Sequence, residues 1–113
     1  MTEMALVVMH EPVLDIKEIE FLVSSLDQRE RELIFREFEE ELAKTMSRTA
    51  LMKLRRGEIH LSNDRIIELM MANEKAKEFV LELVRKKAER LLAIVEKLEK
   101  VEIPKELFEG EEE

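Results

Sequence analysis

The histidines and the densest group of carboxylates are the residues with the most evident capacity for chemistry. His10 and His60 are the only histidines, and neither has a second histidine four residues away, the spacing at which a helix presents two metal ligands on one face. Glu37 and residues 39–41 fall on the solvated side of a predicted amphipathic helix, without a Gly-rich phosphate loop or a nucleophile–base pair. We therefore expect no metal, no cofactor and no enzymatic activity.

The segment 43–57 differs from the rest of the chain in its charge. The protein carries a net charge of −8, yet this segment contains no acidic residue. Its basic residues are Lys44, Arg48, Lys53, Arg55 and Arg56. A cluster of cations in an acidic protein indicates an anionic partner, and double-stranded DNA is the partner that we expect.

The same segment resembles the helix-turn-helix of Cro/repressor-like transcription regulators. Residues 42–46 resemble the scaffold helix of that motif, residues 47–54 resemble its recognition helix, and residues 55–58 resemble the exit from that helix. Residues 61–69 are similar to the capped helix that follows. The resemblance covers about a quarter of the chain, residues 42–69, and its motif is of low specificity.

The resemblance implies a role for each polar residue of the segment. Ser47 is expected to cap the recognition helix, and the side chains expected at the major groove or its phosphates are those of Arg48, Thr49 and Lys53. Arg55 and Arg56 are expected to hold the DNA backbone, with Lys44 completing the basic set.

The turn of this motif departs from the family pattern. Cro/repressor-like proteins have a Gly and an apolar residue before the capping Ser, whereas Met46 directly precedes Ser47 here, so the turn is about two residues short. The alternative is that residues 28–56 form one bent helix whose basic patch is simply a solvated face.

Composition indicates one helical domain. The 113 residues are 41% charged and 45% apolar, with two Gly and two Pro, a balance typical of long helices. The chain has no Cys and no apolar run near the ~18 residues that span a bilayer, so we expect a cytoplasmic protein without membrane association. Abundant Glu, Lys and Arg with a single Gln are typical of a thermophile.

Capping signals and apolar spacing predict helices over about 16–25, 28–45 and 48–56. The second helix has two candidate start signals, Ser25 with Gln28 or Asp27 with Glu30, and Gly57 stands where the third helix ends. Thr45, Ser47 and Thr49 are indifferent helix formers, and we expect a bend or break near residues 45–47. Residues 5–9 are expected to form a short strand or a hydrophobic arm.

The last predicted helix covers about residues 64–100 and holds eight of eleven positions of a heptad pattern with apolar residues. A single helix of this length would span about 55 Å, more than a globule of this mass is wide. It therefore either breaks near Asn73 or is covered by a second subunit. The residues that we expect at a dimer interface are Val80, Val84, Leu91, Ile94 and Leu98.

Together these patterns predict an all-α protein with a small helical head and a long C-terminal amphipathic helix, assembled as a homodimeric helical bundle. One domain is expected over 1–104, followed by an acidic disordered tail over 105–113. The predicted function is that of a dimeric transcriptional regulator or chromatin-associated factor that binds DNA. The alternative is a non-catalytic adaptor that docks on another protein.

Overall fold

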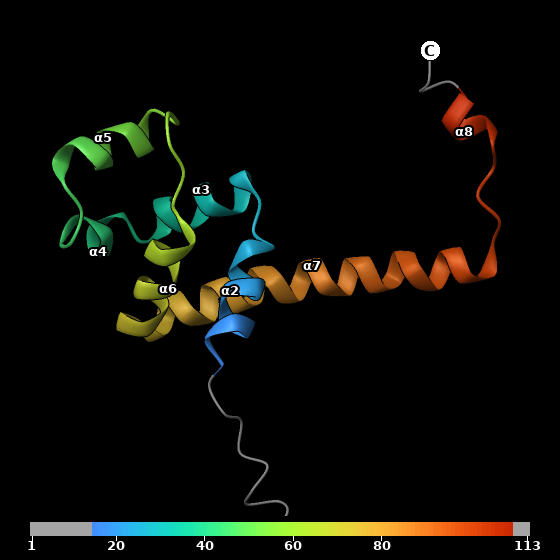
Figure 1. Ribbon diagram of the computed structural model, residues 1–113, viewed down its shortest axis with the longest axis horizontal. Coiled ribbons are helices and arrows are strands. Elements are labelled where there is room, and N and C mark those ends of the chain that lie inside the picture. The colour runs from blue at the N-terminus through green and yellow to red at the C-terminus, as the bar shows by residue number, and fades with distance from the viewer. Residues whose placement is uncertain (1–14, 110–113) are drawn as a thin grey trace, which may run out of the picture.

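The computed structural model describes residues 15–109, and within that range all regular structure is helical. The helices are α2 (Ile16–Ser24), α3 (Gln28–Glu37), α4 (Glu39–Ala43), α5 (Arg48–Arg55), α6 (Asn63–Ala72), α7 (Glu74–Lys100) and α8 (Glu106–Glu109). Figure 1 shows α2, α3 and α6 beside the first half of α7, with α4 and α5 farther from it, while the second half of α7 extends away from all of them. We call α2–α6 with the first half of α7 the head. The predicted all-α class, with a head and a long C-terminal helix, is confirmed. The predictions for residues 5–9, His10 and residues 110–113 lie outside the described range.

Side chains cap the helices of the head at their N-termini, except that of α4. The Asp27 carboxylate accepts from the Glu30 amide at 2.8 Å, and Glu30 accepts from the Asp27 amide at 2.9 Å, so of the two predicted start signals the structure uses Asp27 with Glu30. The Ser62 hydroxyl accepts from the Arg65 amide at 3.2 Å and starts α6. These caps fix the points at which the chain changes direction.

The helix predicted over 28–45 is in fact two helices, because Phe38 leaves the helical conformation at φ −119° and ψ 29°. The Phe38 ring packs edge-on against Phe79 of α7, with the ring centroids 5.6 Å apart and the planes at 80°. This packing places α4 in a new direction. The break at Phe38 thus depends on a tertiary contact, and no Gly or Pro near Phe38 predicts it from the sequence.

The helix predicted over 64–100 breaks at Asn73, which is the first of the two alternatives that the length of this helix left open. Asn73 has an extended backbone, and its side-chain oxygen accepts from the Ala76 amide at 3.1 Å, so it ends α6 and caps α7. The two helices then pack against each other.

The head has one apolar core that draws on every helix from α2 to α7. Ile34, Ile66, Val23 and Val80 are fully buried at its centre. The other buried apolar residues are Leu26, Phe35, Leu42, Leu51, Leu54, Leu61, Ile67, Leu69 and Ala76.

Arg31 joins three segments of the head through hydrogen bonds to oxygen atoms. Its guanidinium donates to the carbonyls of Val23 at 3.0 Å, Leu26 at 3.0 Å and Leu61 at 2.8 Å, and to Oδ1 of Asn63 at 2.7 Å. The segments held are the end of α2, the α2–α3 turn and the connection between α5 and α6. Arg31 therefore fixes the route by which the chain leaves α5.

Within the described range, no helix is both long and apolar enough to cross a membrane. The chain leaves α7 at Val101, and Glu106–Glu109 form the short helix α8. The predicted acidic tail, residues 105–113, includes this short helix. Pro104 stands at the start of this last turn, where its carbonyl accepts from the Leu107 amide at 3.2 Å.

Candidate nucleic-acid interface

A turn separates α4 from α5 at the place predicted for a break. Lys44 is the C-cap of α4, and the Ser47 hydroxyl accepts from the Ala50 amide at 3.1 Å, so Ser47 caps α5. The break expected over 45–47 is confirmed, and so is the capping role of Ser47. The alternative of one bent helix over 28–56 is wrong, because the chain leaves the helical path both at Phe38 and before Ser47.

The core holds α5 by one side and leaves the other side in solvent. Leu51 and Leu54 are buried, whereas the remaining side chains from Arg48 to Arg56 are exposed except Ala50, which is half-buried. At 3.6 residues per turn, Thr49, Lys53 and Arg56 form a ridge directly opposite the buried leucines. The structure thus brings three of the predicted residues together on the outer face of one helix.

Arg48 and Arg55 lie on the flank of this ridge, and Arg55 is already engaged. Its Nε and Nη2 donate to Oε2 of Glu39 at 3.2 and 2.8 Å. The hydrogen bond and the charge of Glu39 raise the pKa of the Arg55 guanidinium above its ordinary value. A phosphate would have to compete with Glu39 for the Arg55 guanidinium.

The other predicted basic residues differ in whether they form an ion pair. Lys44 lies 3.4 Å from a carboxylate oxygen of Glu41, within a pair that is largely exposed. Among the residues that the structure describes, Arg48, Lys53 and Arg56 take part in no ion pair. These three charges are the ones most readily available to an anion.

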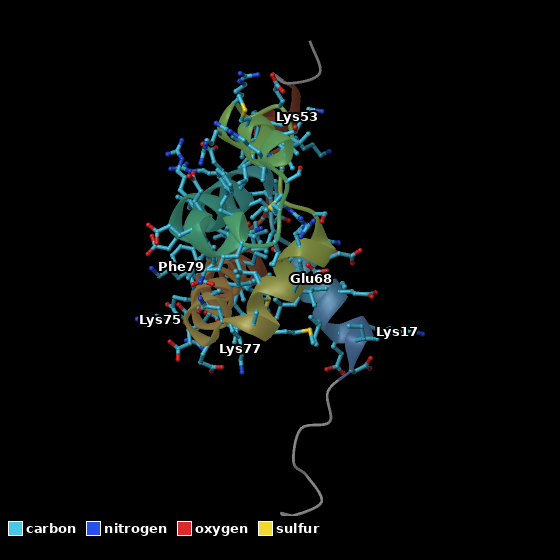
Figure 2. All side chains as sticks on the ribbon, turned by 90° about the vertical axis from the view of Figure 1, so that its left-hand side faces the viewer. Lys17, Lys53, Glu68, Lys75, Lys77 and Phe79 are labelled. Atoms are coloured by element: carbon cyan, nitrogen blue, oxygen red, sulfur yellow. The ribbon has the colours of Figure 1, made fainter. Side chains whose placement is uncertain are left out.

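The basic helix lies at the far end of the head from the extended half of α7. Figure 1 shows α4 and α5 on that end, and Figure 2 shows Lys53 at the opposite extremity of the head from Lys17 of α2 and Lys77 of α7. A straight anionic surface can therefore approach α5 without meeting α2 or α7.

Sequence reasoning missed Glu39 as the partner of Arg55. The two residues are sixteen positions apart, and only the turn between α4 and α5 brings their side chains together. An ion pair between residues three or four positions apart on a helix can be predicted from the sequence, but a pair sixteen positions apart cannot.

The predicted dimer-interface residues divide into two groups. Val80 is fully buried in the chain's own head, and Val84 packs against the head's core, so they are covered within one chain. Leu91, Ile94 and Leu98 are 57%, 44% and 45% exposed on the extended half of α7. Only the second group offers surface to a partner.

No protein-family model matches the chain, and neither the curated proteins nor the solved structures include a significant match to it.

Proposed function

We propose that the protein binds double-stranded DNA through the outer face of α5 and acts as a homodimeric transcriptional regulator or chromatin-associated factor. The observation that carries the proposal is the ridge of Thr49, Lys53 and Arg56 with Arg48 on its flank, in a chain of net charge −8. Binding modules of the helix-turn-helix kind place such a helix in the major groove, with its basic residues on bases and phosphates.

Three features support this placement of α5. The helix has eight residues, it is capped by Ser47, and it is fixed to the core by two buried leucines, so its outer side chains are held on a rigid element. The acidic residues of α4 lie on the preceding helix, and one of them holds Arg55. The acidic excess elsewhere weakens long-range attraction to DNA but leaves local phosphate contacts possible.

The test is the salt dependence of DNA binding by the double variant Arg48→Glu with Lys53→Glu. Fluorescence anisotropy with a labelled random-sequence duplex across a salt series gives the slope of log affinity against log salt, to which each phosphate contact contributes about −0.9. We expect the native protein to bind at ~50 mM salt and the double variant to lose binding under the same conditions.

The matched control is Lys17→Glu with Lys77→Glu, which makes the same change in net charge at the other end of the head. We expect this control to keep most of the affinity and the slope of the native protein. Equal losses in the two double variants would show that only net charge matters. No binding by the native protein at low salt would refute DNA binding.

A second candidate function is a protein-binding adaptor, and the exposed apolar side chains of the extended half of α7 are the observation that favours it. In that case the native protein would not bind DNA at any salt concentration, while this apolar surface would be occupied by a different protein. The two functions are separated by the anisotropy experiment.

A further inference from the structure

The second half of α7 carries an apolar surface that the described part of the chain does not cover. We call residues 88–101 the stalk, because every one of them is exposed and Figure 1 shows no helix of the head alongside them. Its apolar side chains are Ala88, Leu91, Leu92, Ala93, Ile94, Val95, Leu98 and Val101. Apolar patches of this extent on a soluble chain mark interaction sites.

The stalk surface is a direct continuation of the face by which α7 holds its own head. Ala76 and Val80 are buried there, and the same spacing of three and four residues leads through Val84 and Lys87 to Leu91. Lys87 marks where the head ends, since its Nζ donates to the Ser25 carbonyl at 2.5 Å and to Glu30 at 2.6 Å. The head and any partner of the stalk thus share one face of α7, one after the other.

This arrangement decides how a second copy can pair. In a parallel pair, the partner's α7 would run along the same face past Lys87 and would collide with α3 and the α2–α3 turn. In an antiparallel pair, the head-bearing half of the partner's α7 continues beyond Val101, away from the first head. We propose that two copies of the chain pair antiparallel through their stalks.

The stalk is self-complementary in that orientation. When the two helices are centred on Glu96, Leu91 lies opposite the second copy's Val101 and Ile94 lies opposite its Leu98, and both pairs occur twice by symmetry. All four layers are then apolar. Val95 of each copy meets its counterpart beside the central layers, and the one unfavourable contact brings the two Lys97 side chains near each other.

The pairing holds the two heads far apart. Val80 of the two copies would be separated by about 48 Å along the bundle, at 1.5 Å per residue, and α5 lies farther out still. One turn of DNA is about 34 Å, so the two α5 helices are too far apart for adjacent major grooves. This consequence, unlike the pairing itself, rests on the proposed DNA binding, and it predicts contacts about two turns apart or on two DNA segments.

The pairing is tested by the mass in solution and by cysteine cross-linking, for which the cysteine-free chain is well suited. We expect light scattering after size exclusion to give twice the chain mass of 13.4 kDa for the native protein and for Ala93→Lys on the opposite side of the stalk. We expect Leu98→Lys to give the mass of one chain. A native protein with the mass of one chain overturns the proposal.

Orientation is read from two single-cysteine variants, Leu91→Cys and Val101→Cys. In the antiparallel pair, like cysteines lie about 15 Å apart, beyond the ~7 Å limit between the Cα atoms of a disulfide, whereas unlike cysteines face each other. The two variants are mixed in equal amounts, with a tag on one of them, and oxidised. We expect disulfide-linked dimers in this mixture and no disulfide-linked dimers from either variant oxidised alone. Cross-linking of either variant alone, or none in the mixture, overturns the antiparallel arrangement.

The spacing of the heads is tested with random-sequence duplexes of about 12 and about 36 base pairs, because 12 base pairs extend only about 41 Å. For each protein we compare the affinity for the longer duplex with the affinity for the shorter one. Bivalent binding should make this ratio at least tenfold larger for the native protein than for Leu98→Lys. An equal gain in both proteins overturns bivalent binding at this spacing. If neither duplex binds, the proposed function fails, while the pairing stands on mass and cross-linking alone.

Discussion

Arg31 offers a direct test of how the head is held together. Replacing it with Met keeps much of the side-chain volume and removes all four hydrogen bonds to Val23, Leu26, Leu61 and Asn63. Hydrogen bonds from a charged donor are worth about 1.5–3 kcal/mol each when fully shielded. Arg31 is only half-buried, so water takes over part of this role.

We therefore expect Arg31→Met to lower the free energy of unfolding by about 3 kcal/mol, below the full sum of its bonds. Against the 5–15 kcal/mol typical of a domain, this is a large loss. Urea titration followed by circular dichroism measures it, with the midpoint falling and the slope unchanged.

The control is Arg36→Met on the same helix, where the guanidinium pairs with Glu32 in an exposed position. We expect that variant to lose no more than about 0.5 kcal/mol, as exposed pairs four residues apart usually do. Equal losses in Arg31→Met and Arg36→Met would refute the reasoning. Arg31→Lys should fall between the native protein and Arg31→Met, because one ammonium group cannot reach all four acceptors.

Two further predictions concern α5 and its surroundings. Ser47→Ala removes the cap of α5 and should lower the free energy of unfolding by about 1 kcal/mol in the same titration. The control Thr49→Ala, at an exposed position, should change the free energy of unfolding by less than about 0.5 kcal/mol. Equal effects of the two substitutions would contradict the capping role of Ser47. Glu39→Ala frees Arg55 for a phosphate and should raise DNA affinity several-fold and steepen the salt slope by about 0.9 in the anisotropy assay. An unchanged slope would show that Arg55 does not contact DNA.

The sequence predicted those features of the fold that depend on local interactions. The capping box at Asp27 and Glu30, the cap at Ser47 and the helix end at Gly57, where φ is +74°, each follow from residues within a few positions of one another. The break at Asn73 was one of two alternatives that the length of the predicted helix left open, and the cap that the Asn73 side chain supplies there was not predicted.

What the sequence did not reveal depends on contacts between distant residues. The break at Phe38 is stabilised by Phe79 of α7, and the residues around Phe38 would continue a helix equally well. At the candidate site, the basic residues were predicted from the sequence, but the salt bridge between Arg55 and Glu39 was not. The burial of Val80 likewise depends on where the head happens to end along α7.

The charges of the head and the geometry of the stalk both bear on how the proposed DNA binding would work in an acidic protein. One head offers Arg48, Lys53 and Arg56 without competition, and about three phosphate contacts give weak binding at physiological salt. Under the proposed pairing, a second head would bring its own three cations to the same DNA as an intramolecular contact, which would raise the overall affinity beyond that of two separate heads. Loss of the stalk pairing should therefore weaken binding to long DNA far more than binding to short DNA, and loss of the α5 cations should weaken both.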